Sequence, residues 1–321
     1  MPCVRSIPRR ALVRVSQWLR PALPHDAFRA LYGLGKLGYL PDYRNPRTFN
    51  EKAVAWLRST RDPKLVERAD KLAVRDHVRE VAPWLALPEV YAVSADAAAF
   101  PFDALPDVSV LKANHGWSQV RVLRRPFDEA AARTTGAAWL AQRHGDERWE
   151  WHFRAIPPRL YAEAYLGDAE GRPPVDYKLL VIGGRVAFVQ CFIGRGVRLR
   201  RVMFDRDWRV LEVYRPRYPG GPPDVVEPAL RPPRPACLDA MIAGAETLGA
   251  EVPLVRVDLY VVDGAPYFGE LTFLPAEGYV PFWPESYDRT LGDAVPWPPG
   301  SPAPPTASRR GQGAPRPASR A

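Results

Sequence analysis

Two carboxylates near the C-terminus have the type and spacing to bind a cation. Residues 255–273 (VRVDLYVVDGAPYFGELTF) predict two strands joined at Asp263-Gly264, a dipeptide that favours a two-residue hairpin turn. This register places Asp258 near Glu270 on the neighbouring strand, where two negative charges repel each other and destabilise the hairpin. Mg²⁺ would compensate them, because it prefers hard oxygen ligands and shares them with substrate phosphates.

An arginine offers a second explanation for the same pair. Arg256 is the only basic residue close to the two carboxylates in the hairpin sequence, whose other flanking residues are neutral. A surface ion network of Asp258, Arg256 and Glu270 would therefore satisfy both carboxylates without a metal. The spacing alone leaves the magnesium site and the ion network open.

Lys112 ends the apolar residues 108–111 and comes just before Asn114, His115 and Gly116. A lysine inside a buried strand is costly unless it meets an anion. A phosphate group is a suitable anion here, since a small polar loop with a glycine follows. The alternative is a lysine at the strand end whose amine reaches solvent.

Glu163 and Lys178 each interrupt another apolar strand. Glu163 lies within residues 160–166 (LYAEAYL), and Lys178 lies within residues 177–182. Alternating strands often carry one solvent-facing charge, so neither residue indicates a site by itself.

The elements that must position these residues form an α+β pattern: a helical N-terminal segment, then mainly antiparallel sheet with covering helices. Thr48 and Glu51 form an S/T-x-x-E capping box that begins one helix, and a second helix follows Asp70. Eight prolines in residues 215–235 predict an extended loop or a lid. The other predicted elements are strands at 108–113, 119–123, 160–166, 177–182, 185–192, 203–204, 210–213, 254–262 and 267–273, and helices at 128–143 and 238–248.

The composition allows a substantial core and favours acidic partners. Of 321 residues, 46% are hydrophobic, so the length suits one large domain or two to three fused subdomains. The net charge of +9 points to nucleotides, anionic glycans, anionic lipid or nucleic acid. Nucleic acid is the least favoured, because four of the surplus arginines lie in residues 296–321, a Pro-, Ser- and Ala-rich tail that we expect to be disordered.

Signals for localisation are weak. Three widely spaced cysteines form neither a disulfide framework nor a paired zinc motif, which favours a reducing cytoplasm. No uncharged apolar run approaches the ~20 residues that span a bilayer, and arginines interrupt the N-terminal apolar stretch. A solvated helix is the favoured interpretation of that stretch. A weak peripheral contact with anionic membrane, at its inner face, is the alternative.

A polar and aromatic stretch suits an acceptor that contains a sugar. Its members stack on sugars in many proteins, but aromatic side chains also build cores, and the sequence leaves both uses open. These residues are Trp117, Trp149, Trp151, His152 and Arg154.

In chain order, these motifs resemble the ATP-grasp proteins and, more narrowly, the TupA-like ATP-grasp family. That family is named for a protein of teichuronopeptide synthesis and is associated with cell-envelope polysaccharide biosynthesis. Six stretches carry the resemblance: TFNEK (48–52), ADKLAVRDHV (69–78), VLKANHG (110–116), IPPRLYAEAYL (156–166), DYKLLVIGG (176–184), and VRVDLY through YFGELTF (255–273). The resemblance implies an ATP-grasp domain at 45–293, between a basic helical segment at 1–44 and the disordered tail at 294–321.

The resemblance implies ATP and Mg²⁺ as cofactors and assigns residues to the nucleotide. Basic residues match positions near the phosphates, and a polar loop matches the flexible loop that closes over them. The segment 163–166 matches the hinge that contacts ribose and adenine. The basic residues are Lys71, Arg75 and Lys112, the loop residues are His115, Gly116 and Ser118, and the hinge residues are Glu163, Ala164, Tyr165 and Leu166.

The resemblance also assigns the metal and the catalytic groups. Asp258 and Glu270 match the magnesium ligands, and Thr272 stands where many ATP-grasp enzymes have a third ligand, asparagine. Arg256 and Lys178 match positions that neutralise charge on the transferred phosphate. The loop HGWSQ (115–119) is shorter and poorer in glycine than the family pattern.

The implied activity is that of a carboxylate–amine ligase, which uses ATP to form an acyl phosphate and then an amide. Its partners would be a nucleotide and an anionic glycan or amino-acid substrate, for example an amino acid joined to a uronic acid. A kinase that phosphorylates a glycan hydroxyl and a non-catalytic protein that binds anionic glycans are the alternatives. The sequence leaves the oligomeric state open.

Overall fold

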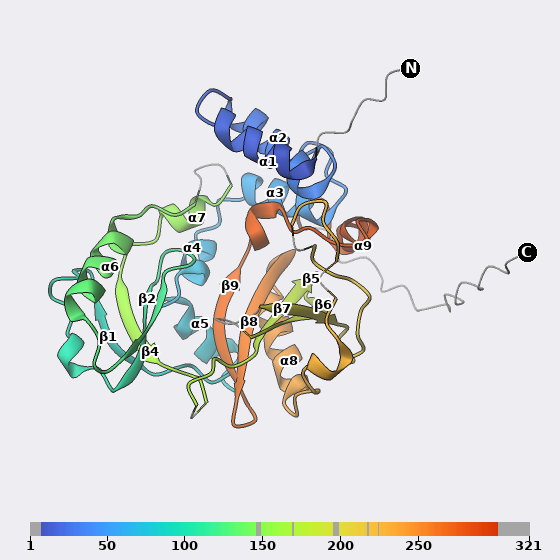
Figure 1. The fold of residues 1–321 in the computed structure, drawn as a ribbon. Helices are drawn as coiled ribbons and strands as arrows, with labels where there is room; N and C mark the ends of the chain where they lie inside the picture. The colour runs from blue at the N-terminus through green and yellow to red at the C-terminus, as the bar shows by residue number, and fades with distance from the viewer. Residues whose placement is uncertain are drawn as a thin grey trace, which may run out of the picture.

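The computed structural model describes residues 8–145, 149–168, 170–194, 199–216, 218–223 and 225–300. Within these ranges the chain forms two lobes, each built on an antiparallel sheet, with a pair of helices above them (Figure 1). The predicted α+β class, with antiparallel sheets and covering helices, is therefore confirmed. Most of the tail for which we predict disorder, residues 301–321, lies outside the described residues.

The smaller lobe holds a four-stranded sheet in the order β1-β4-β2-β3, antiparallel throughout. Its strands are β1 (Val90–Ser94), β2 (Val108–Ala113), β3 (Val120–Arg124) and β4 (Leu160–Ala164). Helix α6 (Glu129–Ala141) packs against this sheet over a small core that includes Leu111, Leu123 and Leu160. A Cβ at Gly136 of α6 would lie 2.5 Å from a methyl carbon of Leu160, so only glycine permits this close packing.

The larger lobe holds a five-stranded sheet in the order β7-β6-β5-β8-β9, also antiparallel. Its strands are β5 (Asp176–Ile182), β6 (Arg185–Ile193), β7 (Arg200–Phe204), β8 (Leu254–Val262) and β9 (Ala265–Thr272). Helix α8 (Leu238–Gly249) covers one face. Because side chains alternate between the faces of a sheet, Leu179 and Val257 enter the core while Lys178 and Asp258 face the other lobe.

Two two-residue hairpin turns are present, and one of them is the turn predicted at Asp263-Gly264. Gly183 and Gly184 connect β5 to β6, and Asp263 and Gly264 connect β8 to β9, all four with positive φ. Such turns require φ > 0 at both central residues, which explains the glycines. The second turn fixes the register of the hairpin that carries Asp258.

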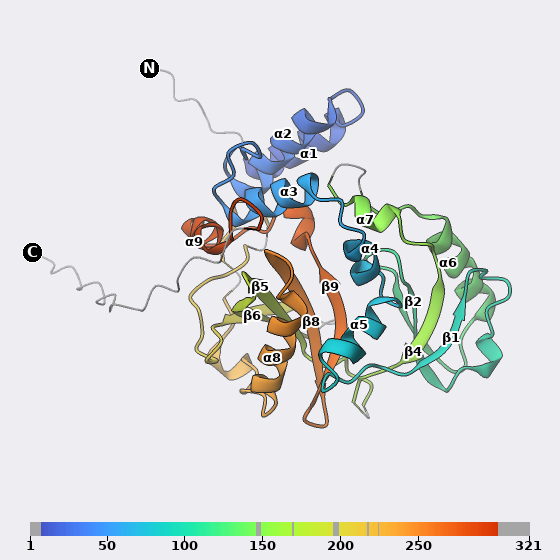
Figure 2. The same cartoon turned by 180° about the vertical axis from the view of Figure 1, so that it is seen from behind.

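The remaining helices join and cap the lobes. Helix α3 (Phe49–Ser59) begins at Thr48 with the predicted capping box to Glu51, which is confirmed. Asn50 of α3 donates to Asp288 Oδ2 of α9 (Ser286–Ala294) at 2.8 Å and ties these two helices together. Helices α4 (Lys64–Ala69) and α5 (Val74–Val81) lie between the two sheets, and α7 (Trp151–Arg154) lies near α4 (Figure 2).

Two N-terminal helices, α1 (Arg9–Leu19) and α2 (His25–Leu37), form a hairpin above α3 in both views (Figures 1 and 2). Among the described residues, no helix is both long enough and apolar enough to cross a membrane.

One predicted strand is wrong. Residues 210–213 form no strand, and Val210 makes only an isolated bridge to Phe204. The chain turns at residues 205–208, where the ring of Trp208 stacks on that of Phe204 with centroids 4.1 Å apart, and the backbone pairing with β7 is limited to residues 209–211. The described part of the proline-rich residues 215–235 contains one isolated bridge, between Pro216 and Pro223, and one short 3₁₀ turn at 228–230, as an extended loop should.

Candidate functional site

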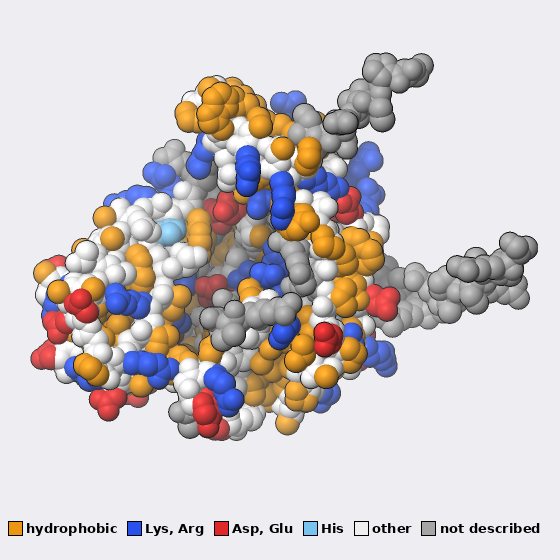
Figure 3. Space-filling model, viewed as in Figure 1, with side chains coloured by type: hydrophobic (Ala, Val, Ile, Leu, Met, Phe, Trp, Pro, Cys, Tyr) orange, Lys and Arg blue, Asp and Glu red, His pale blue; other side chains and the backbone are white. Residues whose placement is uncertain are grey.

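A cavity of about 740 Å³ lies between the two sheets, where Figure 3 shows basic and acidic side chains inside a hollow. Both lobes contribute side chains to it, and most of its charged residues are those that the sequence motifs single out. The cationic lining residues are Lys71, Lys112, Lys178, Arg215 and Arg256, and the anionic ones are Glu163, Asp176, Asp258 and Glu270.

Four polar side chains form a row across the larger sheet. Lys178 of β5 lies opposite Gln190 of β6 on one side and opposite Asp258 of β8 on the other. Asp258 in turn lies opposite Glu270 of β9, so the predicted cross-strand pair of carboxylates is confirmed. All four residues line the cavity.

Three cations compensate the two carboxylates. Arg256 donates to Asp258 through two nitrogens, at 2.6 Å and 2.7 Å, and lies 3.3 Å from Glu270 Oε1. Lys178 forms an ion pair with Asp258, and Lys71 Nζ lies 3.3 Å from Glu270 Oε2. Arg256 is the local cation that the hairpin sequence predicts, and the two lysines come from segments distant in sequence.

The charges around Glu270 keep it ionised. Burial opposes the charged form of this carboxyl group, but Lys71, Arg256 and Lys178 together lower its pKa to about 2. At neutral pH, Glu270 therefore presents carboxylate oxygens, which act only as acceptors or metal ligands.

The pair fits a magnesium ion that is shared with a nucleotide. Mg²⁺ commonly binds through one or two carboxylates together with substrate phosphates, and Asp258 and Glu270 supply two such groups side by side. Within the described ranges, no group of three or more acidic, histidine or cysteine side chains could hold a metal by itself. Thr272 lies opposite Arg256 in the ladder, two pairs beyond Glu270, and does not line the cavity.

On the smaller sheet, Lys112 and Glu163 form an ion pair across strands β2 and β4. Both line the cavity, as expected for residues assigned to the nucleotide. Arg75 does not line the cavity. Its guanidinium approaches Glu163 from outside the cavity, with Nη1 3.6 Å from Oε2, and donates to the Pro88 carbonyl. Arg75 is therefore placed to orient Glu163, and its direct contact with a phosphate stays a prediction.

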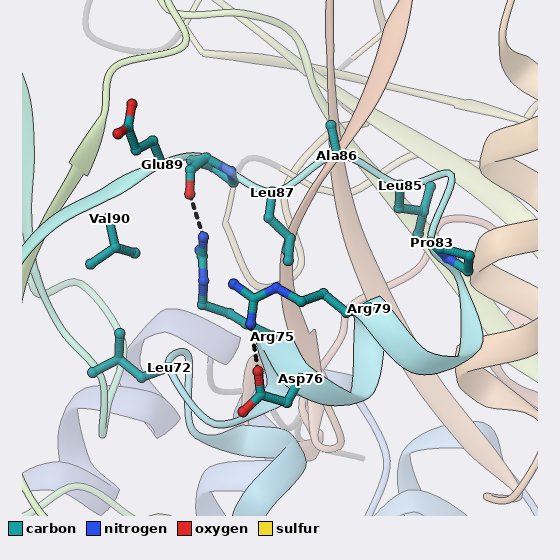
Figure 4. Close-up of a pocket in the computed structure, with 11 residues that line it drawn as sticks. Leu72, Arg75, Asp76, Arg79, Pro83, Leu85, Ala86, Leu87, Glu89 and Val90 are labelled. Carbon is teal, nitrogen blue, oxygen red and sulfur yellow. Dashed lines mark hydrogen bonds and ion pairs between the residues drawn. The ribbon is translucent and has the colours of Figure 1, made fainter.

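Arg75 belongs to a second hollow, of about 660 Å³, between α5 and the segment before β1 (Figure 4). Three of the charged groups drawn there have partners in the protein, since Arg79 pairs with Asp76 and Arg75 donates to the Pro88 carbonyl. Its two arginines are therefore already engaged within the protein.

The loop after β2 approaches the larger lobe through Lys71, which donates to the Gly116 carbonyl at 2.5 Å. Gly116 and Ser118 line the cavity, whereas His115 is buried with Nε2 3.2 Å from the Gln142 carbonyl. Burial lowers the pKa of His115, which favours the neutral ring at this position. His115 therefore anchors the loop, and a contact of its ring with phosphate is not what this geometry favours.

The register of β5 and β8 defines two ends of the cavity. At one end Asp176 lies opposite Tyr260, and the hinge segment Ala164–Leu166 lines the cavity. Four residues further along β5, Leu180 lies opposite Arg256. A strand rises ~3.4 Å per residue, so the two ends are about 13 Å apart. We call these the hinge end and the far end.

Aromatic and aliphatic side chains surround the far end. Phe188 lies opposite Leu180, and the ring of Phe282 lies 6.4 Å from those of Phe49 and Phe188. Of the stretch expected to stack on sugars, only Trp117 lines the cavity. Trp149 is fully buried and Trp151 packs against the main core, so both serve the core.

The sequence profile of the TupA-like ATP-grasp family matches residues 51–296 of this chain. The chain belongs to this family. The predicted ATP-grasp fold is thereby confirmed. A search of the curated proteins found no significant match.

Among solved structures, this ATP-grasp chain is similar to several ligases at low identity. The D-alanine–D-alanine ligase from Bacillus anthracis in complex with ATP is 14% identical at a TM-score of 0.38, over 70% of this chain and 60% of the ligase. The ATP-grasp ligase PsnB with its minimal precursor is 15% identical at 0.39, over 88% and 74%. An ADP complex of purK, N5-carboxyaminoimidazole ribonucleotide synthetase, is 18% identical at 0.42, over 74% and 52%.

The chain thus spans 60% of the length of the D-alanine–D-alanine ligase, and identities and TM-scores this low decide nothing about its activity or substrate.

The sequence analysis does not identify two residues that line the cavity of this ATP-grasp protein, Gln190 and Arg215. Gln190 is 6% exposed, and its Nε2 finds no hydrogen-bond partner in the part of the chain that the structure describes. A glutamine within the apolar strand VAFVQCFI is the signal that could have identified it. Arg215 lies in the proline-rich loop, where the sequence gives no register and no signal.

Proposed function

We propose that this ATP-grasp protein is an ATP- and magnesium-dependent carboxylate–amine ligase that acts on a cell-envelope glycan or its precursor. The observation that carries the proposal is the row of Lys178, Asp258 and Glu270 across β5, β8 and β9, facing Lys112 and Glu163 on the other sheet. This row places carboxylates for a metal beside cations for phosphates in one cavity between the lobes.

The ion pairs in the cavity can exchange partners when a metal–nucleotide complex binds. Lys178 and Arg256 now neutralise Asp258, and Lys71 neutralises Glu270. The cations would then pair with phosphate oxygens, and the carboxylates would bind the metal. Each charge keeps an opposite partner throughout, so no buried carboxylate is left uncompensated, which would cost several kcal/mol.

Two chemical steps follow from the proposal. In the first, a substrate carboxylate oxygen forms a bond to the γ-phosphorus of ATP, the bond from that phosphorus to the β,γ-bridging oxygen breaks, and ADP leaves. In the second, an amine nitrogen forms a bond to the acyl carbon, the carbon–oxygen bond to phosphate breaks, and the amine loses a proton. Lys178 and Arg256 would neutralise the charge that develops on the phosphoryl oxygens, a contribution that depends on fixed positions.

Asp258 and Glu270 would hold the metal, which supplies charge neutralisation and orientation of the phosphates when it is bound. Lys112 would contact the phosphates from the smaller sheet. Glu163, paired with Lys112 and Arg75, would accept from the ribose at the hinge end, beside Ala164–Leu166.

Arg215 supports the proposal that the acceptor substrate is anionic. Among the described residues no carboxylate forms an ion pair with Arg215, and burial together with Arg201 and Arg256 lowers its pKa to about 10. Arg215 follows Tyr214, which bridges to Trp283 next to the far end. Arg215 and the unpartnered Nε2 of Gln190 both line the cavity and would bind the carboxylate of a uronic acid or an amino acid.

Calorimetry tests the proposal directly. ATP should bind the wild-type protein more tightly with Mg²⁺ than without it, and the variant Asp258→Asn/Glu270→Gln should lose that difference. A wild-type protein without magnesium-dependent ATP binding would refute the proposal and favour a non-catalytic glycan-binding protein.

Mass spectrometry of the products separates the two enzymatic alternatives. We expect ADP, phosphate and an amide when the protein acts on ATP, an oligosaccharide that contains uronic acid, and a mixture of amino acids. A phosphorylated glycan with ADP and no amide would instead identify a kinase.

A further inference from the structure

The α1–α2 hairpin carries an aromatic side chain that the described residues leave exposed. Trp18 is 80% exposed and Val15 is 46% exposed, one helical turn apart on α1. Residues three and four apart lie on the same face of a helix, so Arg14 adjoins Trp18 on this outer face. Figure 3 shows hydrophobic side chains gathered at this end of the molecule with basic ones beside them.

The hairpin is firmly built, so the exposure of Trp18 is not a sign of loose packing. A Cβ at Gly35 of α2 would lie 2.8 Å from a methyl carbon of Val13, which shows how closely the two helices pack. Arg9 donates to Glu285 at 2.5 Å, and the Arg10 guanidinium lies 3.1 Å from the ring centroid of Tyr218. These contacts fix the hairpin to the residue before α9 and to the proline-rich loop.

The outer face carries a positive charge that no described residue neutralises. Of the six basic residues in 8–38, Arg9 and Arg29 form ion pairs with Glu285 and Glu277. Helix α1 itself has no acidic residue. Arg14 is exposed and forms no ion pair with any described residue. An unpaired cation beside an exposed tryptophan is complementary to a surface that is negative and has an apolar layer beneath it.

We propose that the outer face of α1, formed by Arg14, Val15 and Trp18, docks on an anionic phospholipid surface. Trp18 would sit at the level of the headgroups, where amphipathic aromatic rings are favoured. Arg14 would meet lipid phosphates, and Val15 would add apolar contact. One tryptophan, one valine and one arginine make this a weak and reversible contact.

The docking surface lies at the end of the molecule that carries α3, away from the β8–β9 turn (Figures 1 and 2). Phe49 of α3 lines the far end of the cavity. A protein docked in this way would therefore present the far end of its cavity toward the membrane side. The docking itself does not depend on any catalytic activity.

Vesicle sedimentation of the full chain tests the proposal. We expect the protein to sediment with vesicles of equal parts phosphatidylglycerol and phosphatidylcholine and to stay in solution with phosphatidylcholine alone. Trp18→Ala should weaken partitioning at least fivefold. Arg14→Glu should do so by more than fivefold, since each basic residue near an anionic surface contributes about that factor. Binding should also weaken as salt rises.

Two matched variants control for the overall positive charge. Trp84→Ala removes a tryptophan of 45% exposure on another surface, and Arg185→Glu makes the same charge change at the β5–β6 turn. Both should alter partitioning less than twofold. Equal binding to neutral vesicles, or equal losses in the control variants, would overturn the proposal. So would a dimer in analytical ultracentrifugation that Trp18→Ala dissolves, because it would assign this face to a second copy of the chain.

Discussion

Lys178 and Asp258 lie directly opposite each other on β5 and β8 and form an ion pair inside the cavity, with side chains that are 9% and 3% exposed. The same lysine amine lies 3.1 Å from Asp176. Lys178 therefore forms ion pairs with two buried carboxylates. These pairs stabilise the fold, and in the proposed reaction the amine of Lys178 would pair with phosphate instead.

Lys178→Met should destabilise the protein by up to about 3–5 kcal/mol, because it removes one cation from a buried ion network and leaves Asp258 paired with Arg256. Urea unfolding at neutral pH measures this change. Lys64→Met is the matched control, since Lys64 pairs with Glu251 at the surface, and it should cost less than about 1 kcal/mol. Equal losses in the two variants would show that the Lys178 amine has access to solvent.

Glu270 should make stability depend on pH in the acid range. Its pKa is about 2 in the folded protein, below the ordinary value of 4.5, so its ionised form stabilises the fold above pH 4.5. That stabilisation should disappear as pH falls from 4.5 toward 2. Urea unfolding at pH 6, 4.5 and 3 should therefore show wild type losing its advantage over Glu270→Gln. An advantage that is constant across this range would mean that Lys71 and Arg256 do not hold the carboxylate.

The sequence predicts the local part of the site well. Asp258 and Glu270 are joined by a short hairpin, and the Asp263-Gly264 turn fixes which residues oppose each other. Local turn chemistry and alternation are enough for that inference. They also predict that Lys178 and Lys112 interrupt apolar strands, although not which carboxylate each lysine meets.

The rest of the site depends on contacts between segments far apart in the chain. Lys71 reaches Glu270 across about two hundred residues, and its position follows from how α4 packs against β9. Arg215 enters the cavity from a loop without periodicity, so no pattern could place it. Arg75 shows another limit of the sequence: its residue type and position suggest a phosphate, but they do not reveal that its side chain contacts Glu163, at 3.6 Å.

Lys112→Met should weaken the binding of Mg·ATP at least tenfold, because it removes a charge that would neutralise phosphate. The effect on stability should be small, since Glu163 keeps Arg75 within 3.6 Å. Calorimetry measures the affinity and urea unfolding the stability. Lys36→Met, on α2, serves as the control and should leave the affinity unchanged. A folded Lys112→Met variant with wild-type affinity would contradict the role of Lys112 at the phosphates.

Thr272→Ala tests whether the third metal ligand of the family pattern is used. Thr272 does not line the cavity, so this variant should change the magnesium-dependent affinity for ATP less than about threefold, well below the tenfold that 1.4 kcal/mol represents. Titration of MgCl₂ at constant ATP gives the comparison with wild type. A tenfold loss would show that the hydroxyl moves to the metal when the nucleotide binds.

Gln190→Leu should lower the proposed amide-forming activity without lowering the stability of the fold. The Nε2 of Gln190 is buried without a hydrogen-bond partner among the described residues, and such a group costs about 1–3 kcal/mol. Leucine has a similar size and no polar atom, so the variant should be as stable as wild type or more stable in urea. Amide formation with an anionic acceptor should fall, while calorimetry should show unchanged binding of Mg·ATP. A clear loss of stability would instead mean that Gln190 has a structural partner, and it would remove the reason to place Gln190 at the acceptor.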